Sequence, residues 1–138
     1  MIFERENTKP ICNPSNKILA KELNKLRRHG NSSFACLTDE DGSYVQVAGS
    51  GICCLLERRN INQKHYRAYQ NPPIVPPDFK DGTILSFSGG EIPLNRNEWF
   101  KIDQVIETFC AFNKKSQFPE YINWKEITSI FSKTLGTK

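Results

Sequence analysis

The two histidines, His29 and His65, are the only imidazoles in the sequence, so acid–base chemistry near neutral pH would centre on one of them. Each stands beside cationic residues, which favours a surface role. Shortly after His65 come Tyr66, Arg67 and Tyr69. These aromatic and cationic groups could stack on RNA or support a ribonuclease-like reaction. No second histidine or pair of carboxylates stands at an informative spacing, so we expect the protein not to be an enzyme.

The cysteines form no recognisable ligand or disulfide pattern. They are Cys12, Cys36, Cys53, Cys54 and Cys110. Their number is odd and no C-x-x-C pair occurs, which argues against a disulfide framework and against a zinc knuckle. The Gly89-Gly90 pair predicts a turn and not a phosphate-binding loop, because no helix with a P-loop lysine follows it. We therefore expect no metal site, no cofactor, and reduced thiols in a reducing compartment.

The most concentrated acidic segment is Asp39-Glu40-Asp41. It has two interpretations: a solvated hairpin turn, or an acidic finger that contacts a basic partner. A second candidate region is the proline-rich stretch 60–81, because long irregular connections in compact domains are commonly functional. The candidate partner-binding residues are Asp39, Glu40, Asp41, His65, Tyr66, Arg67 and Tyr69.

The charge balance is mildly basic. The chain of 138 residues carries 19 Lys and Arg against 15 Asp and Glu, a net charge of +4. The basic residues crowd segments 17–28 and 58–67. Such clusters can be footprints of nucleic-acid binding, but solvated helix faces and the rims of protein interfaces are commoner. A nucleic-acid-binding module that uses the basic and aromatic residues of these segments is therefore the alternative function.

The first ten residues, MIFERENTKP, contain four charged side chains and no apolar core of a signal peptide. No window of the sequence approaches the roughly 18 apolar residues that a membrane span needs. We expect a soluble, cytoplasmic protein with no membrane partner.

A helix is predicted in the first third of the chain. Leu19, Leu23 and Leu26 stand at i, i+4 and i+7, the spacing of one helical face. Asn13 or Ser15 is expected to cap its start, and the helix should end near residue 29, before a glycine.

Strands are predicted in the middle of the chain, paired as an antiparallel meander. Alternating or continuous apolar residues separated by turn signals mark segments 33–38, 44–47, 52–58, 83–88 and 91–94, with a brief strand at 65–69. The segment Gly49-Ser50-Gly51 is expected to break or bend the second strand.

The longest apolar stripe begins after Lys101. Ile102, Val105, Ile106, Phe109 and Phe112 fall on one helical face. The helix should stop before Pro119, and the alternation from Glu120 to Trp124 predicts a short strand. We expect Phe109, Phe112 and Trp124 to be buried, and a short terminal helix to start near Ile127, with Ile130 and Phe131 on its apolar side. Together these elements predict one α+β domain over residues 1–138: an N-terminal helix, an antiparallel β-meander, a long helix, and a short C-terminal strand and helix.

Residues 83–126 resemble a family of bacterial immunity proteins from polymorphic-toxin and contact-dependent inhibition systems, often encoded beside nucleic-acid deaminase toxins. The resemblance lies in strands with a glycine turn, an apolar helix ending in phenylalanine, a proline, and a hydrophobic-x-Trp ending. The matching residues are Val105, Ile106, Phe109, Phe112, Pro119, Ile122 and Trp124. They look like residues of the family's core and not like toxin contacts.

The resemblance implies a small cytoplasmic inhibitor that binds one cognate toxin domain and blocks its active site or its access to nucleic acid. Such inhibitors are often acidic, because they occupy a basic cleft, whereas this chain is net positive. The acidic segment 39–41 would have to act locally.

Overall fold

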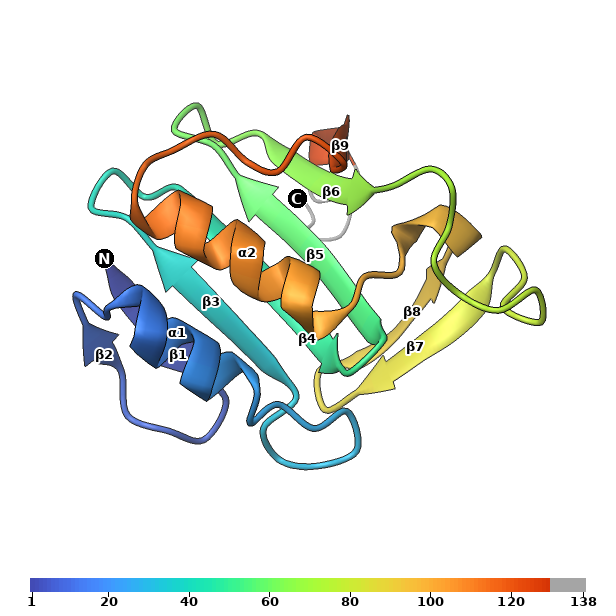
Figure 1. The fold of residues 1–138 in the computed structure, drawn as a ribbon, viewed down its shortest axis with the longest axis horizontal. Helices are drawn as coiled ribbons and strands as arrows, with labels where there is room; N and C mark the ends of the chain where they lie inside the picture. Colours follow the sequence, from blue (N-terminus) through green and yellow to red (C-terminus); the bar gives the residue numbers. More distant parts are fainter. Residues whose placement is uncertain (130–138) are drawn as a thin grey trace.

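The computed structural model describes residues 1–129, in which two helices pack on an antiparallel sheet in an α+β fold (Figure 1). Its elements are β1 (Ile2–Arg5), β2 (Ile11–Cys12), α1 (Asn16–Leu23), β3 (Phe34–Thr38), β4 (Tyr44–Ser50), β5 (Cys53–Arg59), β6 (His65–Tyr69), β7 (Thr83–Phe87), β8 (Gly90–Leu94), the 3₁₀ turn η1 (Arg96–Glu98), α2 (Ile102–Asn113) and β9 (Asn123–Glu126).

Seven strands form one antiparallel sheet in the order β2-β1-β3-β4-β5-β6-β9. The β3–β4 and β4–β5 pairs are consecutive hairpins, as the meander predicts. The brief strand expected at 65–69 is β6, which extends the sheet by pairing with β5. Strands β4 and β5 are the longest, at seven residues each, and lie in the middle of the sheet. Their apolar side chains face both sides of the sheet, so both sides must be covered near the centre.

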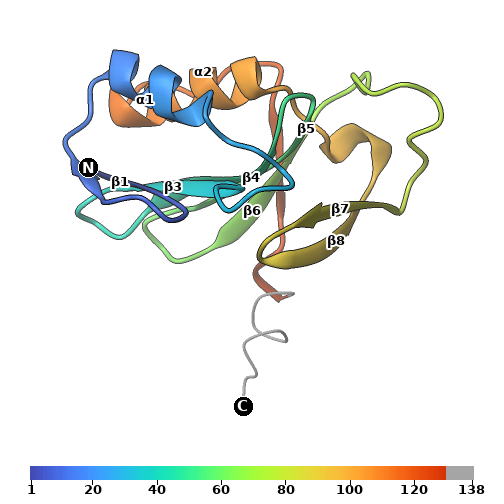
Figure 2. The same cartoon turned by 90° about the horizontal axis from the view of Figure 1, so that it is seen from below.

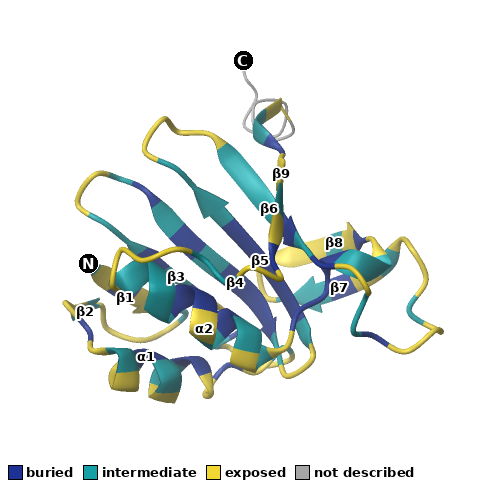
Figure 3. Ribbon diagram, turned by 45° about the horizontal axis from the view of Figure 1, so that its top comes forward, coloured by how far each residue is buried: buried dark blue, intermediate teal, exposed yellow. Residues whose placement is uncertain are grey.

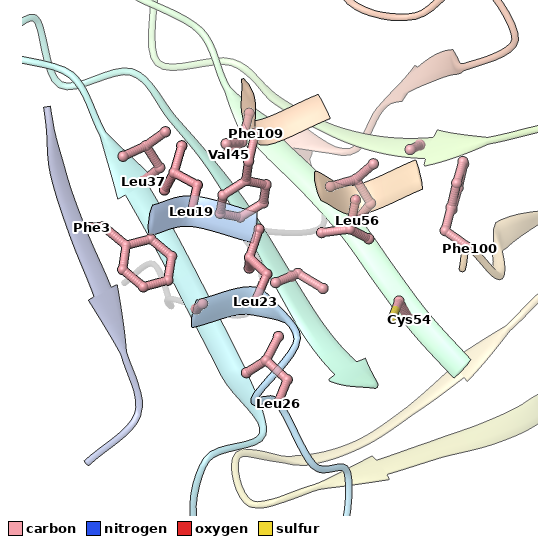
Figure 4. Close-up of a cluster of buried hydrophobic side chains, with 14 of the residues drawn as sticks. Phe3, Leu19, Leu23, Leu26, Leu37, Val45, Cys54, Leu56, Phe100 and Phe109 are labelled. Carbon is pink, nitrogen blue, oxygen red and sulfur yellow. The ribbon is translucent and has the colours of Figure 1, made fainter. Parts of the chain in front are cut away.

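Helices α1 and α2 lie together on one face of this sheet (Figure 2). Ser15 caps α1 by accepting a hydrogen bond from the backbone N–H of Ile18. Leu19 and Leu23 of α1 are buried, as is Phe109 of α2, whose ring packs edge-on to Phe3 (Figure 4). The apolar stripes of both helices and this face of the sheet therefore make the main core.

The β7–β8 hairpin was expected to continue the meander, and that expectation is wrong. These two strands form a separate two-stranded sheet. Leu85 and Leu94 of the hairpin pack with Trp99 and with Ala48 and Leu55, which point away from the helices. The hairpin thus covers one end of the second face of the large sheet and makes a smaller core there.

Strands β1 and β2 were not predicted. The segment Ile2–Arg5 is too short to show an alternation of apolar and polar residues, and only Phe3 of β1 is buried. Its pairing with β3 and the burial of the Phe3 ring against Phe109 hold it in the sheet. This is tertiary packing that the local sequence does not reveal.

Helix α1 is shorter than predicted. It ends at Leu23, and the next residues make tight turns in which the N–H of Leu26 bonds to the carbonyl of Leu23. These turns still bring Leu26 into the core, so the three leucines are all buried although the helix does not reach residue 29. A backbone bridge between Arg27 and Ser32 then reverses the chain.

The expected burial of the C-terminal aromatics holds for Phe109 but is wrong for Phe112 and Trp124, which are only partly buried at the margin of the core. The strand predicted at 120–124 starts later, as β9, because the backbone first makes a turn after Pro119. The fully buried tryptophan is Trp99. The predicted terminal helix lies mostly outside the described residues, at Ile130 and Phe131.

Gly49 belongs to β4 and does not break it. Its φ is +105°, and a Cβ at this position would lie 1.9 Å from the carbonyl oxygen of Cys53. Only glycine fits where β4 and β5 approach so closely before the turn. Among residues 1–129, no helix is long and apolar enough to cross a membrane.

We predict that Phe109→Ala lowers the free energy of unfolding by about 3–5 kcal/mol, because it leaves a cavity between the sheet and both helices. Ile61→Ala, at a side chain 64% exposed, is the control and should change stability by less than about 0.5 kcal/mol. Urea denaturation of both variants measures the difference. Equal midpoints would contradict the placement of α2.

We also predict a ranking of thiol reactivity. All five cysteines are unpaired, Cys12 is exposed, and burial raises the pKa of the Cys54 thiol to about 12. Alkylation of the native protein at pH 8, followed by mass spectrometry, should label Cys12 first and Cys54 only after unfolding. The denatured, unreduced protein should take up five labels, and three would reveal a disulfide.

Candidate functional site

Figure 2 shows α1 and α2 on one side of the sheet and the β7–β8 hairpin on the other side, at one end only. The face that points away from the helices is therefore only partly covered, and we call it the open face. Figure 3, in which the helices lie in front, shows long buried stretches in β4 and β5. Strand register puts the following side chains on it: Cys36, Thr38, Tyr44, Gln46, Glu57, Arg59, His65, Arg67, Tyr69 and Lys125. Polar and aromatic groups dominate this set. The face therefore offers hydrogen-bonding and charged groups on a rigid sheet.

At one end of the open face, three side chains from neighbouring strands form a row. The Arg59 guanidinium lies 4.9 Å from the centre of the Tyr44 ring and donates to the carbonyl of Gly42 at 2.6 Å. The Tyr44 hydroxyl is 3.4 Å from His65 Nδ1. Burial, with a smaller contribution from Arg59, lowers the pKa of His65, and burial raises that of Tyr44. The imidazole is therefore neutral at pH 7.

The acidic turn joins this row through Gly42. Asp39 Oδ1 accepts the N–H of Glu40 at 2.7 Å, and the Asp39 side chain, 13% exposed, lies 3.6 Å from Lys115. Asp41 accepts the N–H and the hydroxyl of Ser43, and these bonds lower the pKa of its carboxyl. Asp39 and Asp41 thus have structural roles in the turn, while the Glu40 side chain is exposed. The turn has a fixed backbone, and its exposed acidic residues are Glu40 and Asp41.

Arg67 was expected to be a contact residue, but it belongs to an internal ion network. Its Nε lies 2.8 Å from Glu57, and its Nη1 lies 3.9 Å from Glu98. Glu57 also accepts from Gln46, and Glu98 pairs with Lys125 at 2.9 Å. Both carboxylates are buried, so the removal of Arg67 would leave the buried charge of Glu57 without its cationic partner. The network ties β4, β5, β6 and β9 together through side chains.

The candidate residues on β6 divide between the two faces. His65, Arg67 and Tyr69 lie on the open face, whereas Tyr66 lies on the helix side, 4.4 Å from the Arg58 guanidinium. His65 is therefore linked to the acidic turn through Tyr44 and Arg59, whereas Tyr66, on the opposite face, approaches the turn only through Arg58. The predicted set is not one continuous surface.

A groove of about 320 Å³ lies on the open face beside the β7–β8 hairpin. Phe34, Leu55, Phe87 and Ile92 give it an apolar lining, and Glu57 stands at its side. Phe34 is 40% exposed and packs edge-on to Phe87. The groove could take an apolar side chain of a binding partner.

The two basic segments do not combine into one patch. Lys17 and Lys21 are exposed on α1, and Lys25, just after the end of this helix, is exposed and pairs with Glu22. In the second segment, Arg58 faces the helix side and Arg59 the open face. Both arginines border the groove beside the acidic turn, where the carboxylates of Asp39 and Asp41 would repel a phosphate backbone.

The chemistry available around His65 is limited. Tyr44 and Arg59 are its neighbours on the open face, and residues 1–129 contain no group of three or more His, Cys, Asp or Glu that could hold a metal ion. Tyr44 and Arg59 were not predicted as site residues. The pairing of Thr38 with Tyr44 and of Arg59 with His65 would have indicated them, had the register been known.

Comparison of the sequence with protein-family models and with curated proteins gave no match.

We predict that stability falls as pH drops from 7.5 to 5.5. The folded-state pKa of His65 is lowered, so its contribution is complete above the unfolded value near 6.5 and is lost as pH falls towards the folded one. Thermal unfolding of His65→Gln should show a smaller fall over this range. His29→Gln removes the other, exposed histidine and should keep the fall of the native protein. An identical pH dependence for His65→Gln and the native protein would contradict the burial of His65.

Proposed function

We propose that the protein is an immunity protein that binds a cognate bacterial toxin domain acting on nucleic acid and blocks its active site or its access to substrate. One observation carries the proposal: an acidic turn is fixed by hydrogen bonds from its own backbone, from Ser43 and from Arg59, beside aromatic groups on an open sheet face. The resemblance of residues 83–126 to toxin-immunity proteins supports the same function.

The acidic turn suits a basic partner for a physical reason. A toxin that acts on nucleic acid must attract phosphates, so its cleft is positively charged. Carboxylates on a rigid hairpin can occupy such a cleft with little loss of conformational freedom, because the turn is already ordered before binding. The local charge of the turn matters here more than the net charge of +4.

The surrounding surface adds groups of the kind that dominate protein interfaces. Tyr44, Arg59 and His65 adjoin the turn, and the groove at Phe34 lies on the same face. Tyrosine and arginine are enriched among residues that contribute most to binding energy. A partner that covers the turn could therefore extend over the open face.

The decisive experiment pairs the protein with the product of the neighbouring open reading frame, where a toxin gene should lie. Co-expression should restore growth of cells that produce this toxin, and calorimetry should show a one-to-one complex in the nanomolar range typical of tight inhibitors. Growth arrest despite stable co-expression would contradict the proposal.

The alternative, a nucleic-acid-binding module, makes the opposite prediction. Its affinity for RNA or DNA would fall log-linearly between 50 and 200 mM salt for many sequences. Binding to single-stranded RNA with such a salt dependence, together with no binding to the toxin, would favour the alternative.

Within the proposed interface, we predict that Glu40→Lys weakens toxin binding at least tenfold, chiefly through slower association at low salt. Glu40 is exposed and its carboxylate is not part of the hydrogen bonds of the turn, so the fold should be unaffected. Asp103→Lys introduces the same charge change at an exposed position on α2, on the helix side, and should bind as the native protein does. Equal association rates for both variants would place the contact surface elsewhere.

A further inference from the structure

The Arg58 guanidinium is surrounded by aromatic rings on the helix side of the sheet. Its central carbon lies 4.4 Å from the ring centre of Tyr66, 4.9 Å from that of Trp124 and 5.3 Å from that of Phe118. Phe118 and Trp124 also pack on each other, at 5.2 Å. Aromatic rings from β6, from β9 and from the loop before β9 thus hold the Arg58 guanidinium in one position.

Arg58 differs from the other arginines because, within residues 1–129, its guanidinium has neither a carboxylate partner nor a hydrogen bond. Arg59 and Arg96 also lack a carboxylate, but they donate to the backbone carbonyls of Gly42 and Val75. Arg5 pairs with Glu22, and Arg67 pairs with Glu57. Among the described residues, Arg58 makes no ion pair, and its buried Nε has no hydrogen-bond partner. Burial lowers the pKa of Arg58 from its usual value, and no carboxylate opposes this effect. A desolvated guanidinium without an acceptor is unfavourable unless a ligand supplies one.

The guanidinium borders an open groove of about 360 Å³. The groove lies between the acidic turn, the turn after β5 and the C-terminal end of α2, and its charged lining is Arg58, Arg59, Lys115, Asp39 and Asp41. Phe112 and Phe118 form its apolar side. It is therefore accessible to solvent, carries both signs of charge and adjoins the turn of the proposed interface.

We propose that this groove receives a carboxylate side chain of the protein partner, an Asp or Glu that pairs with the Arg58 guanidinium. The inference rests on the proposed function and assigns one contact within it. A guanidinium offers two parallel N–H groups that match a carboxylate, and the rings around Arg58 shield one side of such a pair from solvent, which strengthens it.

The mixed charge of the groove decides which anion fits. A phosphodiester chain passing Arg58 would meet the carboxylates of Asp39 and Asp41, which repel it. A single carboxylate next to a basic residue matches both signs: it pairs with Arg58 while its basic neighbour faces the two aspartates. A partner segment that combines an acidic and a basic residue is thus the complementary chemistry.

The site is tested first with acetate on the full chain. In ¹⁵N-labelled protein at constant ionic strength, sodium acetate should shift the Arg58 Nε–H and the Trp124 indole signals in a saturable way, and sodium chloride should not. Arg58→Met should abolish the response, and Arg58→Lys should weaken it. Arg27→Met, at an exposed arginine that donates to the backbone carbonyls of Asn24 and Leu26, is the control and should retain it.

Two results would overturn the site. One is a response to acetate no larger than that to chloride in a protein whose remaining spectrum shows the native fold. The other is a response to inorganic phosphate at concentrations more than tenfold lower than acetate, which would assign the groove to phosphate chemistry.

Binding measurements with the toxin distinguish a failure of this inference from a failure of the proposed function. Arg58→Met should weaken toxin binding at least tenfold through faster dissociation, because the partner's carboxylate then loses its buried cation. Toxin binding that is unchanged in Arg58→Met would overturn the inference and leave the inhibitor function standing. No toxin binding by the native protein would overturn the proposed function itself.

Discussion

The central pair of strands, β4 and β5, has apolar side chains on both faces, whereas the two helices cover only one. Val47 and Leu56 face the helices; Ala48 and Leu55 face the other way and require a second cover. The β7–β8 hairpin and Trp99 supply that cover at one end of the sheet. At the other end the strands carry polar groups that bond to one another, so this part stays open. The division of the sheet into a covered and an open end follows from this single constraint.

Two buried carboxylates hold the open end together. Glu57 joins β4 to β6 through Gln46 and Arg67, and Glu98 joins η1 to β9 through Lys125. Such pairs contribute little net stability compared with apolar contacts, but they fix one arrangement, because any slip in strand register would leave a carboxylate unpaired. The geometry of the proposed binding surface therefore depends on ion pairs and hydrogen bonds within the sheet.

Sequence patterns predicted the fold class, the β3–β4 and β4–β5 pairs and the apolar face of α2, because these rest on local periodicity. They did not predict β1, the docking of the β7–β8 hairpin or the partial exposure of Trp124, all of which depend on contacts between distant segments. The candidate site shows the same limit. The acidic turn was evident in the sequence, but the position of Tyr66 and the ion pairs of Arg67 follow from which strand neighbours which.

The order of the sheet also determines how another chain could approach it. One outer strand, β2, has only two residues, and the other, β9, is a four-residue segment with charged side chains at Lys125 and Glu126. Short and charged borders offer few free backbone groups for an added strand, which discourages fibril-like self-association through edge pairing. A partner should therefore recognise side chains on the faces and turns of this protein, and its specificity should depend on sequence more than on shared backbone geometry.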